Sequence, residues 1–411
     1  MKHVFLLIDA LRSSYLTEEN MPFLYSLTTK GLYIKSINPS SGFCERSEIF
    51  SGLNCFETGN FTAIGYYPSK SVYRDWKCTL ALVDFCSYFA PDIVRKLFKR
   101  YRKKRGVRMN PYLIPYKSLP NYVLTEDNTE FSFVNHRTIE DVLKEEGKKY
   151  TMDFFTALSD LKPRTNLSIY DFLKHSIVKD YYFIPLYVGV IDSVGHLHAD
   201  DIITMKPYLR KVDDIIKTLY MESSNNGYSF SVLGDHGMVP VLKKIDIRKE
   251  INKLGLRLGS DYEMFLDSTI ARFWFLKESA SKLIKDAIQE SLMSDGVIVD
   301  KSNMKQYGIP LDIIFKNGKP VYGDLVWCAN PGVLICPDYF NPQLKDIRGM
   351  HGYLMTDDLE GCGLYVSVGG LDKTKTIEKA PLKSVCSELC RVLEIPLPNS
   401  NWTRKVYGEF C

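Results

Sequence analysis

The segment Val4-Phe5-Leu6-Leu7-Ile8-Asp9-Ala10-Leu11-Arg12, close to the first residue of the sequence, decides the fold. Five consecutive apolar residues followed by an aspartate are typical of a strand buried in a parallel sheet. Ligands of open α/β sheets bind at the carboxyl ends of the strands, which is where Asp9 would lie. Capping of a following helix also explains a carboxylate at this position, so this segment alone leaves both interpretations open.

Two later segments have the same design, an apolar run that ends in an aspartate with a histidine close behind it. They are Tyr182–Ile191, followed by Asp192 and His196, and Tyr228–Gly234, followed by Asp235 and His236. Three predicted strands that each stop at an aspartate favour a shared chemical role over three separate helix caps. A further histidine, His351, stands between Met350 and Gly352 much later in the chain.

Length and composition limit the class of protein. With 411 residues and 45% hydrophobic composition, the chain can bury a large core, as two or three domains or as one large α/β domain with insertions. A net charge of +4 is not diagnostic of nucleic-acid binding. The ten cysteines form no CxxC pair, which argues against a zinc ribbon and a dense disulfide framework.

The lengths of the apolar runs indicate where in the cell the protein is located. The apolar run before Asp9 is too short for the core of a signal sequence. No stretch reaches the roughly 18 apolar residues that a membrane span requires. We therefore expect a cytoplasmic protein, with peripheral contact to a membrane left open.

Residues 246–335 differ in character from the rest of the chain, with a lysine-rich helical pattern and several turn signals. We interpret them as an inserted smaller subdomain. The catalytic α/β domain would then comprise residues 1–245 and 336–411, with an irregular insertion at about 70–131.

That irregular insertion contains a conspicuous basic run, Arg95–Arg108, with nine Lys and Arg and no acidic residue. Leu97, Phe98 and Tyr101 interleave with the basic side chains. A solvated helix face or a mobile loop would explain the run. A surface for anionic lipid, nucleic acid or a phosphorylated substrate would explain it equally well.

Six side chains at strand ends and in turns are candidate metal ligands: Asp9, Asp192, His196, Asp235, His236 and His351. Carboxylate and imidazole together suit borderline divalent metals, and zinc first among them. Six ligands are about the number that two metal ions need when each keeps a position open for substrate. Such a pair clamps the attacking and leaving oxygens of a phosphoryl displacement. His198 lies close by but is better explained as a surface or supporting residue.

Four motifs, in this order along the chain, resemble the alkaline phosphatase superfamily, and within it the type I phosphodiesterase / nucleotide pyrophosphatase branch. They are Leu7-Ile8-Asp9-Ala10-Leu11-Arg12, Asp192-Ser193-Val194-Gly195-His196, Asp235-His236-Gly237-Met238 and Gly349-Met350-His351-Gly352-Tyr353. The second and third are fairly specific, and together the four span almost the whole chain.

This resemblance implies an α/β fold with a central, mostly parallel sheet and helices on both of its faces. It also implies a hydrolase with two divalent ions, expected to be Zn²⁺. One ion would be held by Asp192, His196 and His351, and the other by Asp9, Asp235 and His236. The attacking group would be a serine or threonine hydroxyl, activated by the metal, that forms a covalent phosphoenzyme.

One departure from the family pattern concerns that hydroxyl. Relatives carry it ten residues before the glycine that corresponds to Gly52, a position that here is Gly42. The neighbouring Ser41 is our predicted nucleophile. Ser40, Ser47 and Cys44 are weaker candidates, and direct attack by water is a further alternative.

Arg46 stands where sulfatases have the arginine of their C-x-P-x-R element, but the cysteine and proline positions are Gly42 and Cys44, which argues against a sulfatase. Arg46 is predicted to contact a phosphate oxygen, or else to pair with Glu45 or Glu48 on an exposed helix.

The leading hypothesis is metal-dependent hydrolysis of a phosphodiester or pyrophosphate bond. The substrate would be a small molecule or a glycan- or lipid-linked phosphodiester, with possible peripheral membrane contact through Arg95–Arg108 and no specific nucleic acid. A phosphoethanolamine- or phosphoglycerol-type transferase is one alternative. A non-catalytic protein that holds metal and a phosphorylated ligand is the other, suggested by Gly42.

Overall fold

The computed structural model describes residues 1–107, 109–110, 112–125, 136–155, 164–314, 318–341, 346–354, 360–370 and 374–400. The chain divides into two compact units. The first comprises Met1–Asn60, Ser132–Leu242 and Asp346–Arg404, and the second is built from Phe61–Phe131 and Lys243–Lys345. Within the described part of the chain, we find no helix with the length and apolar character needed to cross a membrane.

The first unit is built on a six-stranded sheet with the order β16-β2-β15-β6-β1-β5. Its strands are β1 (His3–Ile8), β2 (Leu32–Asn38), β5 (Phe183–Val188), β6 (Ser229–Leu233), β15 (Gly363–Val368) and β16 (Lys375–Pro381). β1 runs parallel to both β5 and β6, and β2 runs parallel to β16, whereas β15 is antiparallel to its two neighbours. The predicted central, mostly parallel sheet is confirmed.

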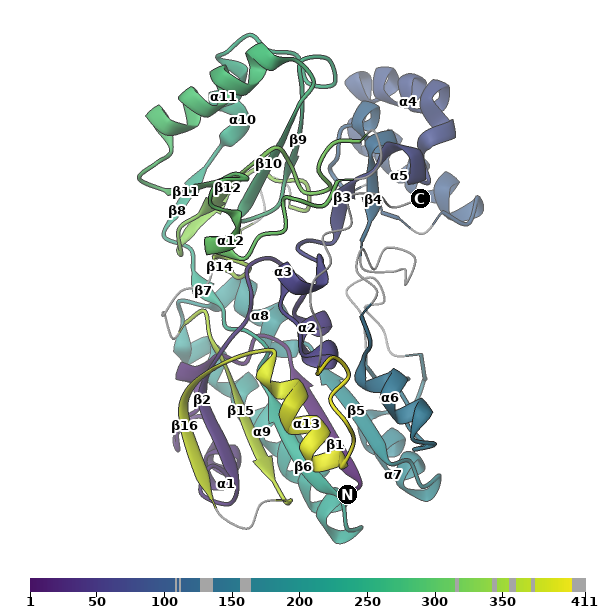
Figure 1. Cartoon of the computed structure of the whole chain (residues 1–411), viewed down its shortest axis with the longest axis vertical. Coiled ribbons are helices and arrows are strands. Elements are labelled where there is room, and N and C mark those ends of the chain that lie inside the picture. Colours follow the sequence, from purple (N-terminus) through teal and green to yellow (C-terminus); the bar gives the residue numbers. More distant parts are fainter. Residues whose placement is uncertain are drawn as a thin grey trace. The chain divides into compact units, whose positions relative to one another are not determined.

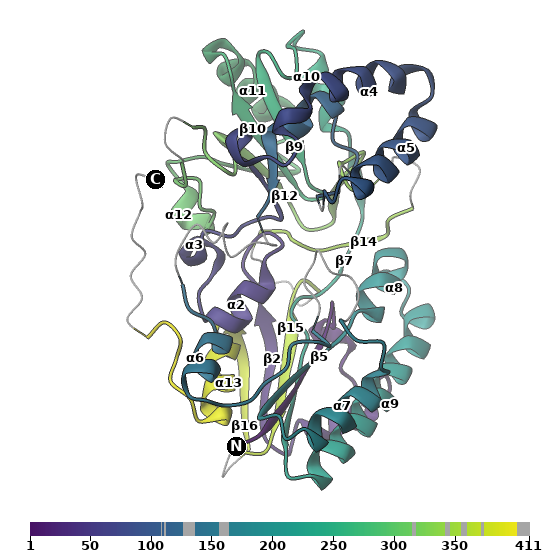
Figure 2. The same cartoon turned by 90° about the vertical axis from the view of Figure 1, so that its right-hand side faces the viewer.

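Helices cover both faces of this sheet (Figures 1 and 2). They are α1 (Pro22–Leu27), α2 (Glu45–Ser51), α3 (Cys55–Thr58), α6 (Ile139–Glu145), α7 (Ile169–Val178), α8 (Val190–His198), α9 (Ile202–Asn225) and α13 (Ser384–Leu393), with a short 3₁₀ helix η1 (Ser13–Tyr15). In Figure 2, α6 and α13 lie on one side of the strands and α7 and α9 on the other.

β1 shows why the sheet needs two helical layers. Every residue of this strand is buried. Alternate side chains point to opposite faces, so Val4 and Leu6 pack into the core that contains α9, while Phe5 and Leu7 pack into the core that contains α13. This two-sided burial explains the unbroken apolar run in the sequence.

The second unit contains an antiparallel sheet with the order β11-β12-β10-β9, formed by β9 (Tyr262–Leu266), β10 (Ile270–Phe275), β11 (Gly296–Val299) and β12 (Leu325–Ala329). Two strand pairs accompany it, β3 (Ile64–Tyr66) with β4 (Tyr122–Leu124), and β8 (Lys243–Ile245) with β13 (Val333–Ile335). Its helices are α4 (Lys77–Phe89), α5 (Pro91–Lys104), α10 (Ile247–Asn252), α11 (Glu278–Ser291) and α12 (Met304–Tyr307), with the 3₁₀ helices η2 (Pro68–Lys70), η3 (Arg74–Trp76) and η4 (Tyr116–Asn121).

Hydrogen bonds explain why residues 61–131 belong to this second unit, whereas the sequence-based division left 70–131 with the first. Ser118 and Asn121 each donate a hydrogen bond of 2.9 Å to the carboxylate of Glu263 on β9. The guanidinium of Arg272 on β10 donates to the carbonyl of Ile64 on β3. These contacts join segments about 140 to 200 residues apart, and local sequence patterns carry no signal for them.

Candidate active site

The strand ends bring the predicted aspartates to one edge of the central sheet. Leu7 of β1 lies opposite Leu233 of β6, and Ile8 lies opposite Val188 of β5. Because these strands are parallel, the residues that follow them emerge at the same edge. Asp9 comes directly after β1, and Asp235 is the second residue after β6. The predicted strand Tyr182–Ile191 was too long: β5 ends at Val188, and Asp192 lies in the first turn of α8, which begins at Val190.

A short strand pair brings His351 to the same edge. β14 (Gly349–Met350) pairs antiparallel with β7 (Val239–Pro240), which follows the loop that carries His236. The backbone amide of Arg348 donates to the carbonyl of His196 on α8, at 2.8 Å. The residues around β14 therefore connect α8 to the loop after β6.

The structure gathers five of the six predicted ligands into groups whose ligand atoms lie within 4.8 Å of one another. One group is Asp192, His196 and His351, a second is Asp9, Asp192 and His236, and a third is Glu45, His236 and His351. Asp192 belongs to two of these groups and therefore links them.

The first group has the spacing of a tetrahedral metal site. The Oδ1 atom of Asp192 lies 3.3 Å from Nε2 of His196 and 3.6 Å from Nε2 of His351. Two ligand atoms that are each about 2.0–2.1 Å from a tetrahedral zinc are roughly 3.3 Å apart. Nδ1 of His196 contacts the carbonyl of Gly349 at 2.9 Å. A proton on Nδ1 leaves Nε2 with a lone pair for a metal.

Electrostatics of the first group also fit a cation. Oδ1 of Asp192 is buried and has no hydrogen-bond partner among the described residues, a costly condition for a carboxylate oxygen. Burial, together with the nearby imidazoles of His236 and His196, holds the pKa of His351 well below its usual range. A neutral imidazole is the form that binds metals.

The second group surrounds Asp9. Its Oδ1 atom is 3.1 Å from Nε2 of His236, and its Oδ2 atom accepts a hydrogen bond from the hydroxyl of Tyr187. Burial opposes ionisation of Asp9, but the hydrogen bond and charge of His236 outweigh it and lower the pKa of the carboxyl. Conversely, burial disfavours charge on His236, yet Asp235 and Asp9 raise its pKa well above the usual value. The negative potential here favours a bound cation.

Asp235 lies beside this group without being part of it. Its Oδ1 atom is 3.9 Å from Nε2 of His236 and accepts hydrogen bonds from the backbone amides of Ala10 and His236, at 3.3 and 3.1 Å. Burial raises the pKa of Asp235 to about 7. Its role as a ligand stays a prediction.

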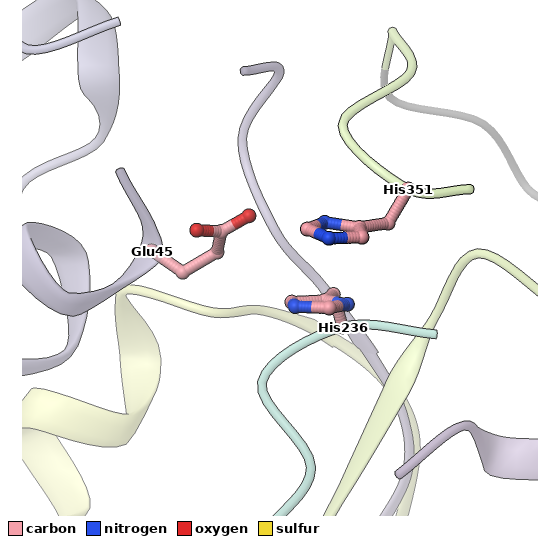
Figure 3. A group of neighbouring side chains, drawn as sticks. All are labelled: Glu45, His236 and His351. Carbon is pink, nitrogen blue, oxygen red and sulfur yellow. The ribbon is translucent and has the colours of Figure 1, made fainter. Parts of the chain in front are cut away.

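Glu45 is the residue that the sequence interpretation missed as a possible ligand. It is the first residue of α2 and is buried. The rings of His236 and His351 stack with centroids 3.9 Å apart. Figure 3 shows the Glu45 carboxylate directed toward these rings. A usable signal existed, because β2 is a further strand of the parallel set and α2 follows its carboxyl end.

The candidate nucleophiles Ser40 and Ser41 lie in the turn before α2. A pocket at the site is lined by residues that include Asn38, Ser40, Glu45, His236, His351 and Tyr353. Ser40 is thus at the pocket, whereas Ser41 is only 3% exposed and is not one of the lining residues. Gly42 has a φ of 96°, a left-handed conformation that glycine adopts without strain.

Arg46 lies close to Asp9, outside its own helix. Its Nη2 atom is 3.9 Å from Oδ2 of Asp9, and its guanidinium lies 5.1 Å from the centre of the Tyr187 ring. Its Nη1 atom is buried and has no hydrogen-bond partner in the described part of the chain. A donor of this kind suits an anionic ligand oxygen.

The hydroxyl of Tyr187 supports a first prediction. Replacing Tyr187→Phe removes the donor that orients Asp9, and loss of such supporting contacts typically weakens metal binding about 10–100-fold. Competition with a chromogenic chelator measures the affinity. Tyr208→Phe, on the exposed surface of α9, is the matched control. Equal affinities in both variants and the wild type would show that Tyr187 does not orient a ligand.

Comparisons with known proteins show the family and the fold of the chain. The model of the type I phosphodiesterase / nucleotide pyrophosphatase family matches residues 3–354. Human ectonucleotide pyrophosphatase / phosphodiesterase 5 superposes with a TM-score of 0.69 and 14% sequence identity, covering 98% of this chain and 97% of its own. No curated protein sequence matches significantly.

The murine protein of the same name superposes with a TM-score of 0.66 and 15% identity, covering 98% of each chain. An inactive threonine-to-alanine variant of that murine protein, in complex with AMP, gives the same TM-score and identity over 98% of this chain and 97% of its own. The structural likeness establishes the fold, and the family match covers most of the sequence. The chain is therefore a hydrolase that belongs to the type I phosphodiesterase / nucleotide pyrophosphatase family of the alkaline phosphatase superfamily.

Proposed function

We propose that the protein hydrolyses a phosphodiester or pyrophosphate bond with the help of two divalent metal ions, expected to be Zn²⁺. The observation that carries this proposal is the buried Oδ1 atom of Asp192, which has no hydrogen-bond partner in the described structure and faces the Nε2 atoms of two histidines. Asp192, His196 and His351 would hold one ion, and Asp9, Asp235 and His236 the other. Bound metal would polarise the phosphoryl oxygen and lower the pKa of the attacking hydroxyl.

Residues of the chain itself would position the substrate. We propose that the buried Nη1 group of Arg46 donates a hydrogen bond to a phosphoryl oxygen, because this donor has no partner within the described residues. Tyr187 would hold Asp9 in place through its hydroxyl. Glu45 adds a fourth carboxyl group to the site, beside His236 and His351, and so offers a further oxygen ligand to a cation.

The attacking hydroxyl belongs, in our proposal, to the turn before α2. Ser41 is the residue next to Gly42, the position that carries the nucleophile in relatives. Ser40 is the second candidate, favoured by its place in the lining of the pocket. A short shift of this turn would be needed to expose Ser41, because its side chain is buried.

Alanine variants of the two serines test the assignment. We expect Ser41→Ala to lower kcat for bis-p-nitrophenyl phosphate by at least about 10³-fold, as removal of a nucleophile does. Ser40→Ala should then retain most of the activity, and the exposed Ser26→Ala serves as the control. The opposite ranking would assign the nucleophile to Ser40, and full activity of both variants would exclude a serine of this turn.

We propose a phosphodiester as the class of substrate. The family supports a small-molecule phosphodiester. A glycan- or lipid-linked phosphodiester is a narrower proposal, which is tested by comparing turnover of a free diester with that of the same group carried on a detergent-solubilised lipid. The cytoplasmic location stays a prediction.

A further inference from the structure

Residues 95–104 of the basic run lie on α5, one arm of a helical hairpin in the second unit. α4 and α5 pack against each other and are joined at Ala90, with Pro91 beginning α5 (Figure 1). At the base of the hairpin, buried Phe98 contacts the rings of Tyr73 and Trp76. Arg102 is also buried there and donates to the carbonyls of Val107 and Met109. The base is therefore fixed by packing and hydrogen bonds.

The other end of the hairpin exposes apolar side chains. Phe85, Tyr88 and Phe89 are 66%, 85% and 70% exposed. Their rings touch one another, with the Phe85–Phe89 and Tyr88–Phe89 centroids 5.4 and 5.3 Å apart. Single exposed apolar residues are ordinary, whereas a contiguous group marks an interaction surface.

Exposed aliphatic residues also lie on both helices of the hairpin. Leu82 on α4 and Ile93 and Leu97 on α5 are each more than 60% exposed. Leu82, Phe85 and Phe89 follow the i, i+3, i+7 spacing of one helix face, and Ile93 and Leu97 are four residues apart. We call Leu82, Phe85, Tyr88, Phe89, Ile93 and Leu97 the apolar tip.

Most residues of the second half of α5 are positively charged. This helix contains seven Lys and Arg and a single acidic residue, Asp92. Arg102 is used internally, as described above, and Arg95 donates to the carbonyl of Tyr112 at 2.7 Å. The exposed cations are Lys96, Arg100, Lys103 and Lys104, with Arg105 directly after the helix. We call these five residues the cationic arm.

We propose that the hairpin docks on an anionic membrane surface, with the apolar tip in the interface and the cationic arm against lipid headgroups. Amphipathic helices with aromatic residues on one part and Lys or Arg on another bind such interfaces. Aromatic side chains settle at the boundary of headgroups and acyl chains, and basic clusters add attraction to anionic lipid. No helix in the described part of the chain is long and apolar enough to span a bilayer, so the contact is peripheral.

The distribution of charge favours an anionic membrane over two other partners, a second copy of the chain and a single-stranded nucleic acid. A second copy of the chain would bring an identical cationic arm against the first, which opposes pairing through this face. Single-stranded nucleic acid binds where aromatic rings and cations alternate along a groove. Here three aromatic rings gather at the tip, and the exposed ring beside the cations, Tyr101, is contacted by Trp76 and Arg105 of the protein itself.

Sedimentation of the full chain with lipid vesicles tests the proposal. We expect binding to vesicles of 70% phosphatidylcholine and 30% phosphatidylglycerol, weakened by high salt, and little binding to pure phosphatidylcholine. Phe85→Ser with Phe89→Ser should reduce the affinity at least about tenfold. Lys96→Gln with Arg100→Gln should reduce it by roughly 5-fold per charge.

Matched controls lie on α11 and beyond it in the same unit. Leu283→Ser with Met293→Ser removes exposed apolar residues elsewhere, and it should bind like the wild type. Circular dichroism melts that match the wild type show that the variants remain folded. Equal binding to both vesicle types, wild-type binding by the hairpin variants, or no vesicle binding at all would overturn the proposal. Loss of a dimer in Phe85→Ser with Phe89→Ser, or binding of a single-stranded oligonucleotide without vesicle binding, would also overturn it.

Discussion

Replacing His351→Ala is expected to lower kcat for a nitrophenyl phosphodiester by about 10³-fold or more, because a metal ligand supplies several kcal/mol of transition-state stabilisation. His351 belongs to two of the three ligand groups, with Asp192 and His196 and with Glu45 and His236. Its loss would therefore disturb more of the centre than the loss of a residue at the periphery. Steady-state kinetics at saturating zinc measure the effect.

His198→Ala is the control for this experiment. His198 lies on α8, two residues after His196, and is in none of the ligand groups of the described structure. We expect it to keep most of the wild-type activity. Comparable losses in both variants would indicate a general effect on folding, and an active His351→Ala variant would contradict the proposed site.

The second large effect concerns the stability of the second unit. Arg272 on β10 is fully buried, and its Nε atom donates to Oδ2 of Asp267 at 3.0 Å. Its guanidinium also lies 4.6 Å from the centre of the Phe265 ring. Removing one partner of a buried pair leaves the other charge uncompensated, which costs about 3–5 kcal/mol. We expect Arg272→Met to lower the free energy of unfolding by that amount.

A double variant separates the lost charge partner from lost packing. Arg272→Met combined with Asp267→Leu removes both charges and should recover much of the stability, because apolar replacements of buried pairs are often neutral. Arg257→Met, which removes an exposed partner of Asp261, should cost less than about 1 kcal/mol. Urea denaturation measures all three. A double variant as unstable as Arg272→Met would show that packing, not charge, makes Arg272 important.

The sequence predicted the central sheet, and it singled out five of the candidate ligands that the structure groups together, because both signals are local. The apolar run before Asp9 is unbroken since β1 is covered on both faces. Parallel pairing then carries Asp9, Asp192 and Asp235 to one edge without further information. His351 was a candidate ligand from its residue type, but its position beside Asp192 and His196 depends on the pairing of β14 with β7, which the sequence pattern does not show.

The remaining features depend on contacts between distant segments. Glu45 was interpreted as a neighbour of Arg46, yet its carboxylate faces His236 and His351, from two other loops. Arg46 itself points to Asp9, 37 positions earlier in the sequence. The grouping of residues 61–131 with 243–345 depends on the bonds of Glu263 and Arg272. The charge and periodicity of a single segment do not predict these contacts between distant segments.

Metal content of the purified protein tests the central claim most directly. Mass spectrometry of the wild type after dialysis should find about two zinc ions per chain, the number that a two-metal phosphoryl-transfer site requires. Asp192→Asn with His196→Ala should reduce this content to about one, while His198→Ala should leave it unchanged. A wild-type protein that binds no divalent metal, before or after incubation with zinc, would contradict the account.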